Sequence, residues 1–299
     1  MKVVYVAGSM RSGTTLMAGL LGSYAGALTV GEINNLWFVA PTGQKCSCGE
    51  ASDECDVWGP VLAHFEGGRT PVEYHKLRKQ VERQRRLREL VSLRHRRESE
   101  WPTDVSEYVA MLRDVVASIE KTTGASTIVD SSKTAPGLAL MRLAVGDQIS
   151  VLHLLRDPRG VAYSEHRHVH ATDELTSRPP LVRPLFRSAM DWDTGNLECW
   201  LVGRVCAVYH RVWYEDLCSD PRGVLNSVGE ALGLGSYPLG GTGDELVLSA
   251  GHVLSGNPSR VGPQSRRITA DDAWRQGLSP PEALAVALLT WPVKRALGR

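Results

Sequence analysis

The strongest sequence signal for the fold is AGSMRSGTTL, Ala7–Leu16, near the start of the chain. It continues the apolar run VVYVAG, Val3–Gly8, which is typical of a buried parallel strand. Gly8 and Gly13 have the spacing of a P-loop, G-x-x-x-x-G-K-[ST], but Thr14 stands where that motif has lysine. Glycines between a strand and a helix present backbone N–H groups to an anion, and the helix N-terminus adds partial positive charge. The sequence therefore predicts an oxyanion-binding loop without the usual lysine.

Side chains within this loop can take over the role of the missing lysine. Arg11 places a positive charge inside the loop, and its guanidinium is a fork-shaped donor suited to bidentate contact with an anion. Ser12, Thr14 and Thr15 add hydroxyl groups next to Gly13. A turn that only joins a strand to a helix is the competing interpretation, and the Arg-Ser-Gly-Thr-Thr run within it favours anion binding instead.

Further strand-like and helical runs alternate along the chain. The strand-like runs are Ser126–Lys133, Ile149–Pro158 and Val205–Tyr214, and the helical runs are Thr14–Leu21, Pro136–Val145, Trp192–Gly203 and Pro221–Leu234. This alternation predicts an α/β fold: a three-layer, P-loop-NTPase-like domain with a central, mainly parallel sheet and helical or loop insertions. The 299 residues suit a single domain, 1–299, with an insertion at 40–110 that is rich in cysteine and contains a basic helix.

A second motif is LLRDPRGVAYS, Leu154–Ser164. Arg156 lies at the expected strand end, and Ser164 follows about two helical turns later. Both are expected at the carboxyl edge of the sheet, where open α/β folds bind ligands. Taken alone, Arg-Asp-Pro is only a strand-to-helix turn, so this motif gains meaning from the first one.

Together, GSMRSGTTL and RDPRGVAYS resemble the sulfotransferases that use 3′-phosphoadenosine 5′-phosphosulfate (PAPS), with Arg11 in place of the usual loop lysine as in many bacterial members. The resemblance implies that the first loop grips the 5′-phosphosulfate, and that Arg156 and Ser164 grip the 3′-phosphate. VWYEDLCSDPRGVLNSVGEALGLG, Val212–Gly235, is similar to a scaffold segment of the family. GNPSRVGPQSRRITADDAW, Gly256–Trp274, is similar to a loop that closes over the nucleotide; its candidate phosphate contacts are Arg260, Arg266 and Arg267.

The resemblance implies transfer of the sulfuryl group of PAPS to a hydroxyl of a small molecule, glycan or lipid, with release of the desulfated product PAP and without a metal. A natural product or a glycolipid is the foremost acceptor class, and the 40–110 insertion is expected on the acceptor side. Glu32, which ends the short apolar strand expected within LTVGEINNLW, resembles the glutamate that serves as base in related enzymes. Arg11 and Lys133 are the other candidate catalytic residues.

Several alternatives remain at this point. His166, His168 and His170 in SEHRHVH are other candidate bases, although a polar helix face explains them as well. A P-loop kinase or NTPase would use Asp130, which ends the run TIVD, as its magnesium carboxylate. A nucleotide-binding regulatory protein that binds PAP without catalysis is a further alternative.

The composition limits the partners. A formal net charge of +1 argues against a dedicated nucleic-acid binder, and no apolar run reaches transmembrane length. Because Arg11 interrupts the apolar N-terminal run, a signal peptide is not expected and we expect a cytoplasmic protein. A homodimer is left open.

Two features of the insertion have no assigned role. Three states are open for Cys46, Cys48 and Cys55: free thiols, one local disulfide, or ligands of a zinc ion with His64 as a conceivable fourth ligand. We expect no metal site. The basic segment Lys76–Arg97 fits a solvated helix face, or a contact with an acidic acceptor, an anionic membrane or a second subunit.

Overall fold

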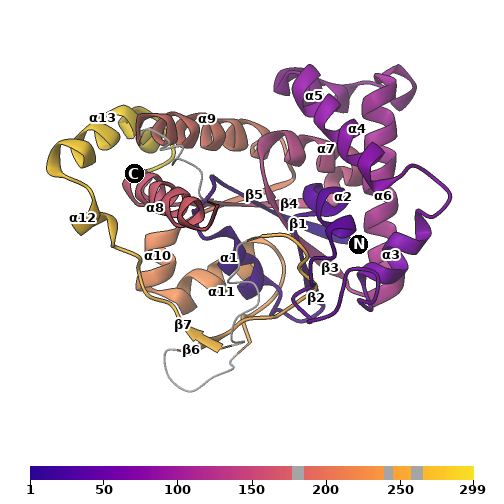
Figure 1. Ribbon diagram of the computed structural model, residues 1–299, viewed down its shortest axis with the longest axis horizontal. Helices are drawn as coiled ribbons and strands as arrows, with labels where there is room; N and C mark the ends of the chain where they lie inside the picture. Colours follow the sequence, from indigo (N-terminus) through magenta and orange to yellow (C-terminus); the bar gives the residue numbers. More distant parts are fainter. Residues whose placement is uncertain (177–184, 239–244, 257–264) are drawn as a thin grey trace.

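The structure, a computed structural model, describes residues 1–176, 185–238, 245–256 and 265–299, apart from the side chains of 168–176, 265 and 266. Its centre is a five-stranded parallel sheet in the order β2-β3-β1-β4-β5 (Figure 1). The strands are β1 Lys2–Ala7, β2 Ala27–Gly31, β3 Thr127–Lys133, β4 Ile149–Leu155 and β5 Val208–Trp213. Because all five strands run parallel, their carboxyl ends meet at one edge, and that edge carries the candidate site.

Each face of the sheet has its own core, because successive side chains of a strand point to opposite faces. On one face Val3, Tyr5 and Ala7 of β1 join residues of α6 (Thr103–Thr123) and α7 (Ala135–Val145). On the other face Val4 and Val6 join residues of α1 (Thr14–Leu21) and α11 (Pro221–Ala231). The predicted three-layer α/β fold with a central parallel sheet is therefore confirmed.

The insertion between β2 and β3 is helical. It holds α2 Leu36–Val39, α3 Trp58–His64, α4 Pro71–Gln84 and α5 Leu87–Ser92, which gather with α6 at the right of Figure 1. The basic segment is not one helix, because Arg85 between α4 and α5 has extended dihedral angles, φ −102° and ψ 126°. Leu77, Val81 and Leu90 of this segment are buried, which explains its helical apolar spacing.

The remaining elements follow β4 and β5. They are α8 Pro158–Thr176, α9 Leu185–Gly203, α10 Tyr214–Ser219, β6 Glu245–Val247, β7 Ser265–Arg267, α12 Trp274–Gly277 and α13 Pro280–Ala296. Short 3₁₀ turns are η1 Ile33–Asn35, η2 Ala40–Thr42, η3 Leu93–His95, η4 Glu98–Glu100 and η5 Gly146–Gln148. Strands β6 and β7 form a small antiparallel pair away from the main sheet. Among the described residues, no helix combines the length and apolar character that crossing a membrane requires.

Candidate active site

The glycine loop, Gly8–Gly13, joins β1 to α1 at the carboxyl edge of the sheet. A Cβ atom on Gly8 would lie 2.4 Å from the carbonyl oxygen of Leu154 in β4, so only glycine lets the two backbones approach this closely. Gly13 has φ 92°, in the left-handed region that favours glycine, and directly precedes α1. The two glycines that define the motif are thus required by the backbone path, independently of any ligand.

Two residues with side chains share the left-handed conformation at this edge. Arg11, inside the glycine loop, has φ 61°, and Lys133, at the end of β3, has φ 62°. Such conformations cost free energy and concentrate at functional sites. Both had been singled out from the sequence as candidate catalytic cations, and the structure places both at the same edge of the sheet.

The two sequence motifs meet through Arg11. Its Nε atom donates to Ser164 Oγ at 3.2 Å, and its carbonyl oxygen accepts from Arg156 Nη1 at 2.9 Å. Burial lowers the pKa of the Arg11 guanidinium from its ordinary value, but an arginine remains a cation at neutral pH. Residues 153 positions apart in the chain therefore form one cationic cluster.

Arg156 is held in place from several sides. Its Nη2 atom donates to the carbonyl oxygen of Asp271 at 3.0 Å and lies 3.2 Å from the Asp271 carboxylate. The guanidinium also lies over the ring of Tyr214, 4.9 Å from the ring centre, which is a cation–π geometry. Arg156 is only 6% exposed and Ser164 only 7%. Both side chains are therefore fixed before any ligand arrives.

The hydroxyl groups of the glycine loop are also ordered. Ser12 is fully buried, and its Oγ lies 2.6 Å from Ser9 Oγ. Thr14 is buried at the first position of α1, and Thr15 is half-buried beside it. The predicted loop donors thus stand where the N-terminus of α1 meets the edge of the sheet.

Glu32 and Lys133 form an ion pair at the carboxyl edge. The Lys133 ammonium contacts Glu32 Oε1, and Asn35 Nδ2 donates to Glu32 Oε2 at 2.5 Å. The Glu32 side chain is 10% exposed and that of Lys133 is 17% exposed. Since Glu32 directly follows β2 and Lys133 ends β3, neighbouring parallel strands bring them together. The structure confirms where the sequence placed them along the strands and adds that they are paired.

Sequence reasoning missed two residues that support Glu32. Arg78 of α4 donates through Nη1 to Asn35 Oδ1 at 2.7 Å and also contacts the carbonyl oxygen of Asn34. Arg78 is held in turn by Glu82, one helical turn later, at 3.0 Å. The Asn35 amide is thereby oriented so that its NH₂ group faces Glu32. Asn35 has a sequence signal in its position three residues after Glu32, but Arg78 looks like any other cation of the basic segment.

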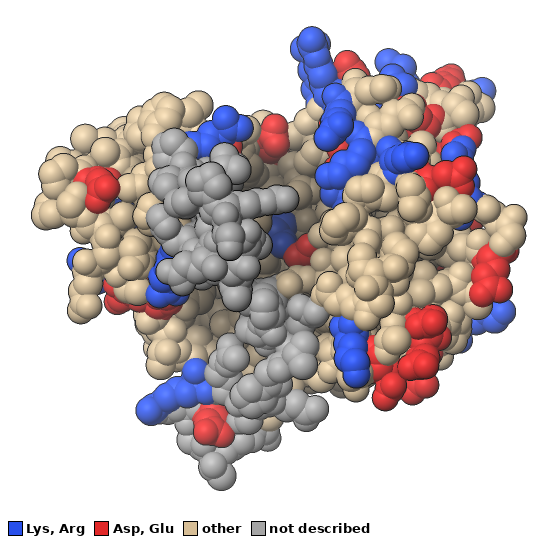
Figure 2. Space-filling view, viewed as in Figure 1, with Lys and Arg blue, Asp and Glu red and all other residues tan. Residues whose placement is uncertain are grey.

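A cleft of about 480 Å³ joins Glu32, Asn35 and Lys133 to the start of the glycine loop, whereas Arg11, Arg156 and Ser164 do not line it. Charged side chains of both signs line it, and charges of both signs are visible in a hollow near the middle of the face in Figure 2. The lining includes Gly8, Ser9, Met10, Glu32, Asn35, Arg78, Glu82, Lys133, Val161, Trp192 and Glu198. Arg78 and Glu82 show that the 40–110 insertion supplies part of the wall. Other basic side chains of α4 and α5 gather on the surface beside it (Figure 2).

Asp130, the carboxylate that a kinase would need, does not line this cleft. It is 1% exposed, and its Oδ1 accepts from the N–H groups of Ser132 (2.9 Å) and Ile33 (3.3 Å) and from the Ser132 hydroxyl (2.5 Å). Burial raises the pKa of Asp130 to about 6. The residue therefore fixes η1, the turn between Glu32 and Asn35, and presents no carboxylate oxygen to the cleft.

Some predicted residues lie outside this arrangement or outside the described residues. Arg260 falls in 257–264, and the side chains of His168, His170 and Arg266 are likewise not described. Arg267 is exposed on β7, opposite Glu245. His166 is not among the residues that line the cleft. Of the three histidines proposed as alternative bases, the one whose side chain is described is therefore not placed for that role.

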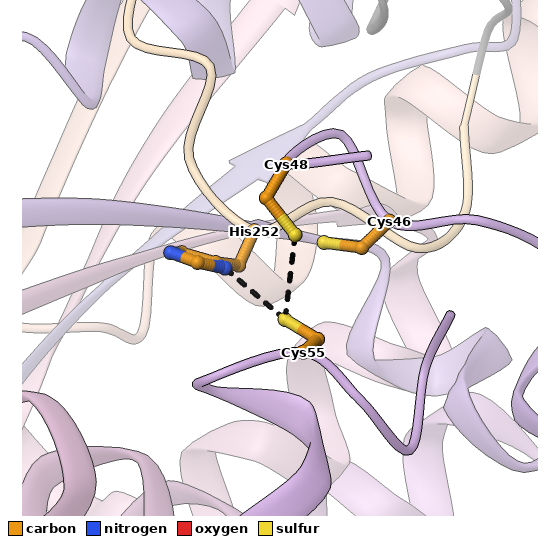
Figure 3. Close-up of side chains that lie close together, drawn as sticks. All are labelled: Cys46, Cys48, Cys55 and His252. Carbon is orange, nitrogen blue, oxygen red and sulfur yellow. Dashed lines mark hydrogen bonds between the residues drawn. The ribbon is translucent and has the colours of Figure 1, made fainter. Parts of the chain in front are cut away.

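The cysteine-rich stretch forms a cluster with a histidine from the other end of the chain. All six cysteines are free in the structure, which does not contain the local disulfide. Ligand atoms of Cys46, Cys48, Cys55 and His252 lie within 4.8 Å of one another and point toward a common centre (Figure 3). The fourth member is His252 and not His64, which packs against Phe65. Spacing in the chain could not indicate His252, because 197 positions separate it from Cys55.

Comparisons with known proteins bear on the fold and the family. None of the curated proteins compared matches the chain. Among solved structures, the sulfotransferase domain from the curacin biosynthetic pathway is similar at 15% identity and a TM-score of 0.49, over 96% of each chain. The sulfotransferase STF9 from Mycobacterium avium is similar at 15% identity and a TM-score of 0.45, over 80% of this chain and 65% of that one.

The family is shown by the sequence itself. A model described as the sulfotransferase family matches residues 4–238. The matched span contains the glycine loop, Glu32, Lys133, Arg156 and Ser164, which the structure brings to one edge of the sheet. The chain belongs to the sulfotransferase family.

Proposed function

We propose that this protein transfers the sulfuryl group of PAPS to a hydroxyl group of a small molecule, glycan or lipid and releases PAP. The observation that carries the proposal is the Glu32–Lys133 ion pair, which shares one cleft with the start of the glycine loop. A carboxylate that can accept a proton therefore lies beside cations that can stabilise a leaving anion. These are the two groups that an in-line transfer from an anionic donor requires.

The cationic cluster supports a donor with phosphate at two positions. The N–H groups and hydroxyls of the glycine loop, with Arg11, Ser12, Gly13, Thr14 and Thr15, would hold the 5′-phosphosulfate at the start of α1. Arg156 and Ser164 would hold the 3′-phosphate. The 3.2 Å contact between Arg11 Nε and Ser164 Oγ supports this arrangement, because it connects the residues proposed for the two phosphates of one donor. A terminal sulfuryl group carries less charge than a γ-phosphoryl group, which agrees with a loop that has no lysine.

Glu32 is the proposed base. As the acceptor oxygen forms a bond to sulfur, its proton passes to the Glu32 carboxylate, and the bond between sulfur and the bridging phosphate oxygen breaks. The electron pair of that bond stays on the departing PAP, whose negative charge Lys133 and Arg11 neutralise. Before the donor binds, Lys133 is paired with Glu32. A bound phosphosulfate would compete for the Lys133 ammonium and leave Glu32 with its hydrogen bond from Asn35.

The cleft lining favours an acceptor with both polar and apolar parts. Arg78, Glu82 and Glu198 offer charged and hydrogen-bonding groups, whereas Met10 and Trp192 offer apolar surface. A natural product or a glycolipid with a free hydroxyl combines these properties. The 40–110 insertion would act on the acceptor side, since α4 contributes Arg78 and Glu82 to the wall.

Thermal unfolding of the purified protein with PAP, 5′-AMP or Mg·ATP tests the donor. A ligand at a hundredfold its dissociation constant adds about 2.7 kcal/mol to the free energy of unfolding. We expect PAP to raise the melting temperature clearly and AMP, which lacks the 3′-phosphate, to raise it little. Stabilisation by Mg·ATP alone would contradict the proposal and favour a kinase. If PAP stabilises the protein, a panel of hydroxyl compounds with PAPS as donor identifies the acceptor.

A further inference from the structure

We propose that Cys46, Cys48, Cys55 and His252 form a structural zinc site, the Cys/His cluster, which fastens the insertion to the segment that follows β6. Three cysteines and one histidine make a Cys₃His set, one of the common ligand sets of structural zinc. The proposal is independent of the sulfuryl-transfer reaction. The metal would have no contact with substrate, because neither the cysteines of the cluster nor His252 lines the cleft.

The distances within the cluster fit one tetrahedral ion. Zinc–sulfur bonds of about 2.3 Å in a tetrahedron place sulfur atoms about 3.8 Å apart, and a sulfur and a nitrogen ligand about 3.6 Å apart. Cys48 Sγ lies 3.7 Å from Cys55 Sγ, and Cys55 Sγ lies 3.2 Å from His252 Nδ1 (Figure 3). These two distances are close to the tetrahedral values, and all four donor atoms lie within 4.8 Å of one another, so small movements would close the set around one ion.

Backbone N–H groups around the cluster donate to two of the sulfurs. The N–H of Cys48 donates to the Cys46 sulfur, and the N–H groups of Val57 and Trp58 donate to the Cys55 sulfur. The Cys46 N–H donates to the carbonyl oxygen of Glu50 at 2.8 Å, which closes the turn. Hydrogen bonds from backbone N–H groups stabilise thiolates, and such outer contacts orient the ligands of a metal. Binding Zn²⁺ would release the thiol protons to solvent.

His252 is held in position from both sides. Its N–H donates to the carbonyl oxygen of Thr29 in β2 at 2.9 Å, and its own carbonyl oxygen accepts from Trp58 Nε1 at 2.7 Å. Ser47, between two of the cysteines, exchanges hydrogen bonds with Val253: its N–H donates to the Val253 carbonyl oxygen at 3.0 Å, and its Oγ accepts from the Val253 N–H at 2.8 Å. The ligands are therefore preorganised by contacts other than those between the sulfurs.

The position of the cluster explains what the metal would stabilise. Residues 252–255 run beside the end of β2, where a Cβ on Gly31 would lie 2.7 Å from Val253 Cγ1. Ser255 Oγ lies 3.4 Å from Asn35 Nδ2, the group that contacts Glu32. A zinc ion on His252 would thus fix the segment that borders the turn carrying Glu32 and Asn35.

Metal analysis of the purified full-length protein, prepared under reducing conditions, tests the proposal. We expect roughly one zinc ion per chain after exhaustive dialysis. Replacement by cobalt should give the intense visible bands of a tetrahedral site and thiolate-to-cobalt charge transfer in the near ultraviolet. Reduced protein that contains no zinc and gives no thiolate–cobalt band would overturn the proposal. A Cys48–Cys55 disulfide in metal-free protein would overturn it as well.

Variants assign the ion to these residues. Cys55→Ser and His252→Ala should lose the zinc, whereas Cys206→Ser, which changes a half-buried cysteine elsewhere, should keep it. His252→Cys restores a four-ligand set and should keep zinc, which covers the case in which the alanine variant does not fold. Zinc retained by both Cys55→Ser and His252→Ala would contradict the assignment. Because metal content is measured without PAP or PAPS, these results do not depend on the proposed function.

Discussion

Residues 252–255 reach the Cys/His cluster through His252 and the cleft through the contact of Ser255 with Asn35, and the two regions differ in their donor atoms. The cleft offers oxygen and cationic nitrogen groups, with Glu32 paired to Lys133, which has a left-handed conformation. The Cys/His cluster offers sulfur and imidazole nitrogen. Burial raises the pKa of the Cys46 thiol to about 12 and also raises the pKa of Cys55. A thiol whose pKa is raised is a poor nucleophile, so Cys46 and Cys55 are not suited to nucleophilic chemistry.

This difference in donor atoms indicates how each region binds its ligand. An ion pair between partly buried side chains can exchange partners when an anionic substrate arrives, which suits a ligand that comes and goes. Thiols held by backbone hydrogen bonds around a fixed centre suit an ion that stays. The cleft is accordingly expected to govern turnover, and the Cys/His cluster to govern stability.

The largest effect is expected for Glu32→Gln. Loss of a general base lowers the rate about 10²- to 10⁴-fold, whereas stabilisation by PAP should remain, because Glu32 does not hold the nucleotide. The measurement is steady-state turnover with PAPS, alongside thermal unfolding with PAP. Glu230→Gln, an exposed carboxylate on α11, is the matched control and should behave as wild type. Wild-type turnover in Glu32→Gln would show that another group accepts the proton.

Asp130→Asn should separate the role of Asp130, which lies within β3, from that of Glu32, which follows β2. Because burial raises the pKa of Asp130 from 3.8 to about 6, the folded state holds this proton more tightly than the unfolded state does. The resulting stability is fully present below about pH 4 and is lost as pH rises through about 6, up to about 3 kcal/mol. Urea unfolding across this range should show a flatter pH dependence for Asp130→Asn than for wild type.

The control for that experiment is Asp147→Asn, since the Asp147 side chain is 87% exposed. It should leave the pH dependence of unfolding as in wild type. Loss of Mg·ATP binding on Asp130→Asn would instead revive the kinase alternative.

Arg156→Gln should weaken PAP binding. A hydrogen bond to a charged group contributes about 1.5–3 kcal/mol, which corresponds to roughly 10- to 150-fold in the dissociation constant. Arg156 also contacts the Arg11 and Asp271 carbonyl oxygens, so its loss affects the glycine loop as well. Calorimetric titration with PAP and with AMP measures the effect, and Arg113→Gln, an exposed arginine on α6, is the control. Equal losses for PAP and AMP would contradict a contact with the 3′-phosphate.

The smallest effect is expected for Ser47→Ala in the Cys/His cluster. The Ser47 hydroxyl donates to the Ala250 carbonyl oxygen at 2.7 Å and accepts from the Val253 N–H, and each such bond is worth about 1 kcal/mol. Denaturant unfolding should show a loss of about 1–2 kcal/mol for the two bonds, with the zinc content unchanged. If zinc is lost together with this hydroxyl, the preorganisation of the ligands is weaker than the contacts of His252 indicate.

Much of the fold was predictable because its determinants are local. The apolar runs of β1 and β4 are buried on both faces of a parallel sheet, and such strands are nearly continuous in apolar residues. The glycine loop was predictable for the same reason, since its glycines and its arginine are adjacent in the chain. Glu32 and Lys133 followed from their positions after strands, which parallel pairing brings to one edge.

The sequence alone was therefore enough to predict the α/β sheet, the anion-binding loop and the residues placed at strand ends. The tertiary structure decided that Lys133 pairs with Glu32, that Arg78 orients Asn35, and that His252 completes the cysteines. Each of these contacts joins segments that are far apart in the chain, and their partners are set by packing between elements. Hydrophobic periodicity fixes which face of an element is buried, but it carries no information on which distant side chain will meet it there.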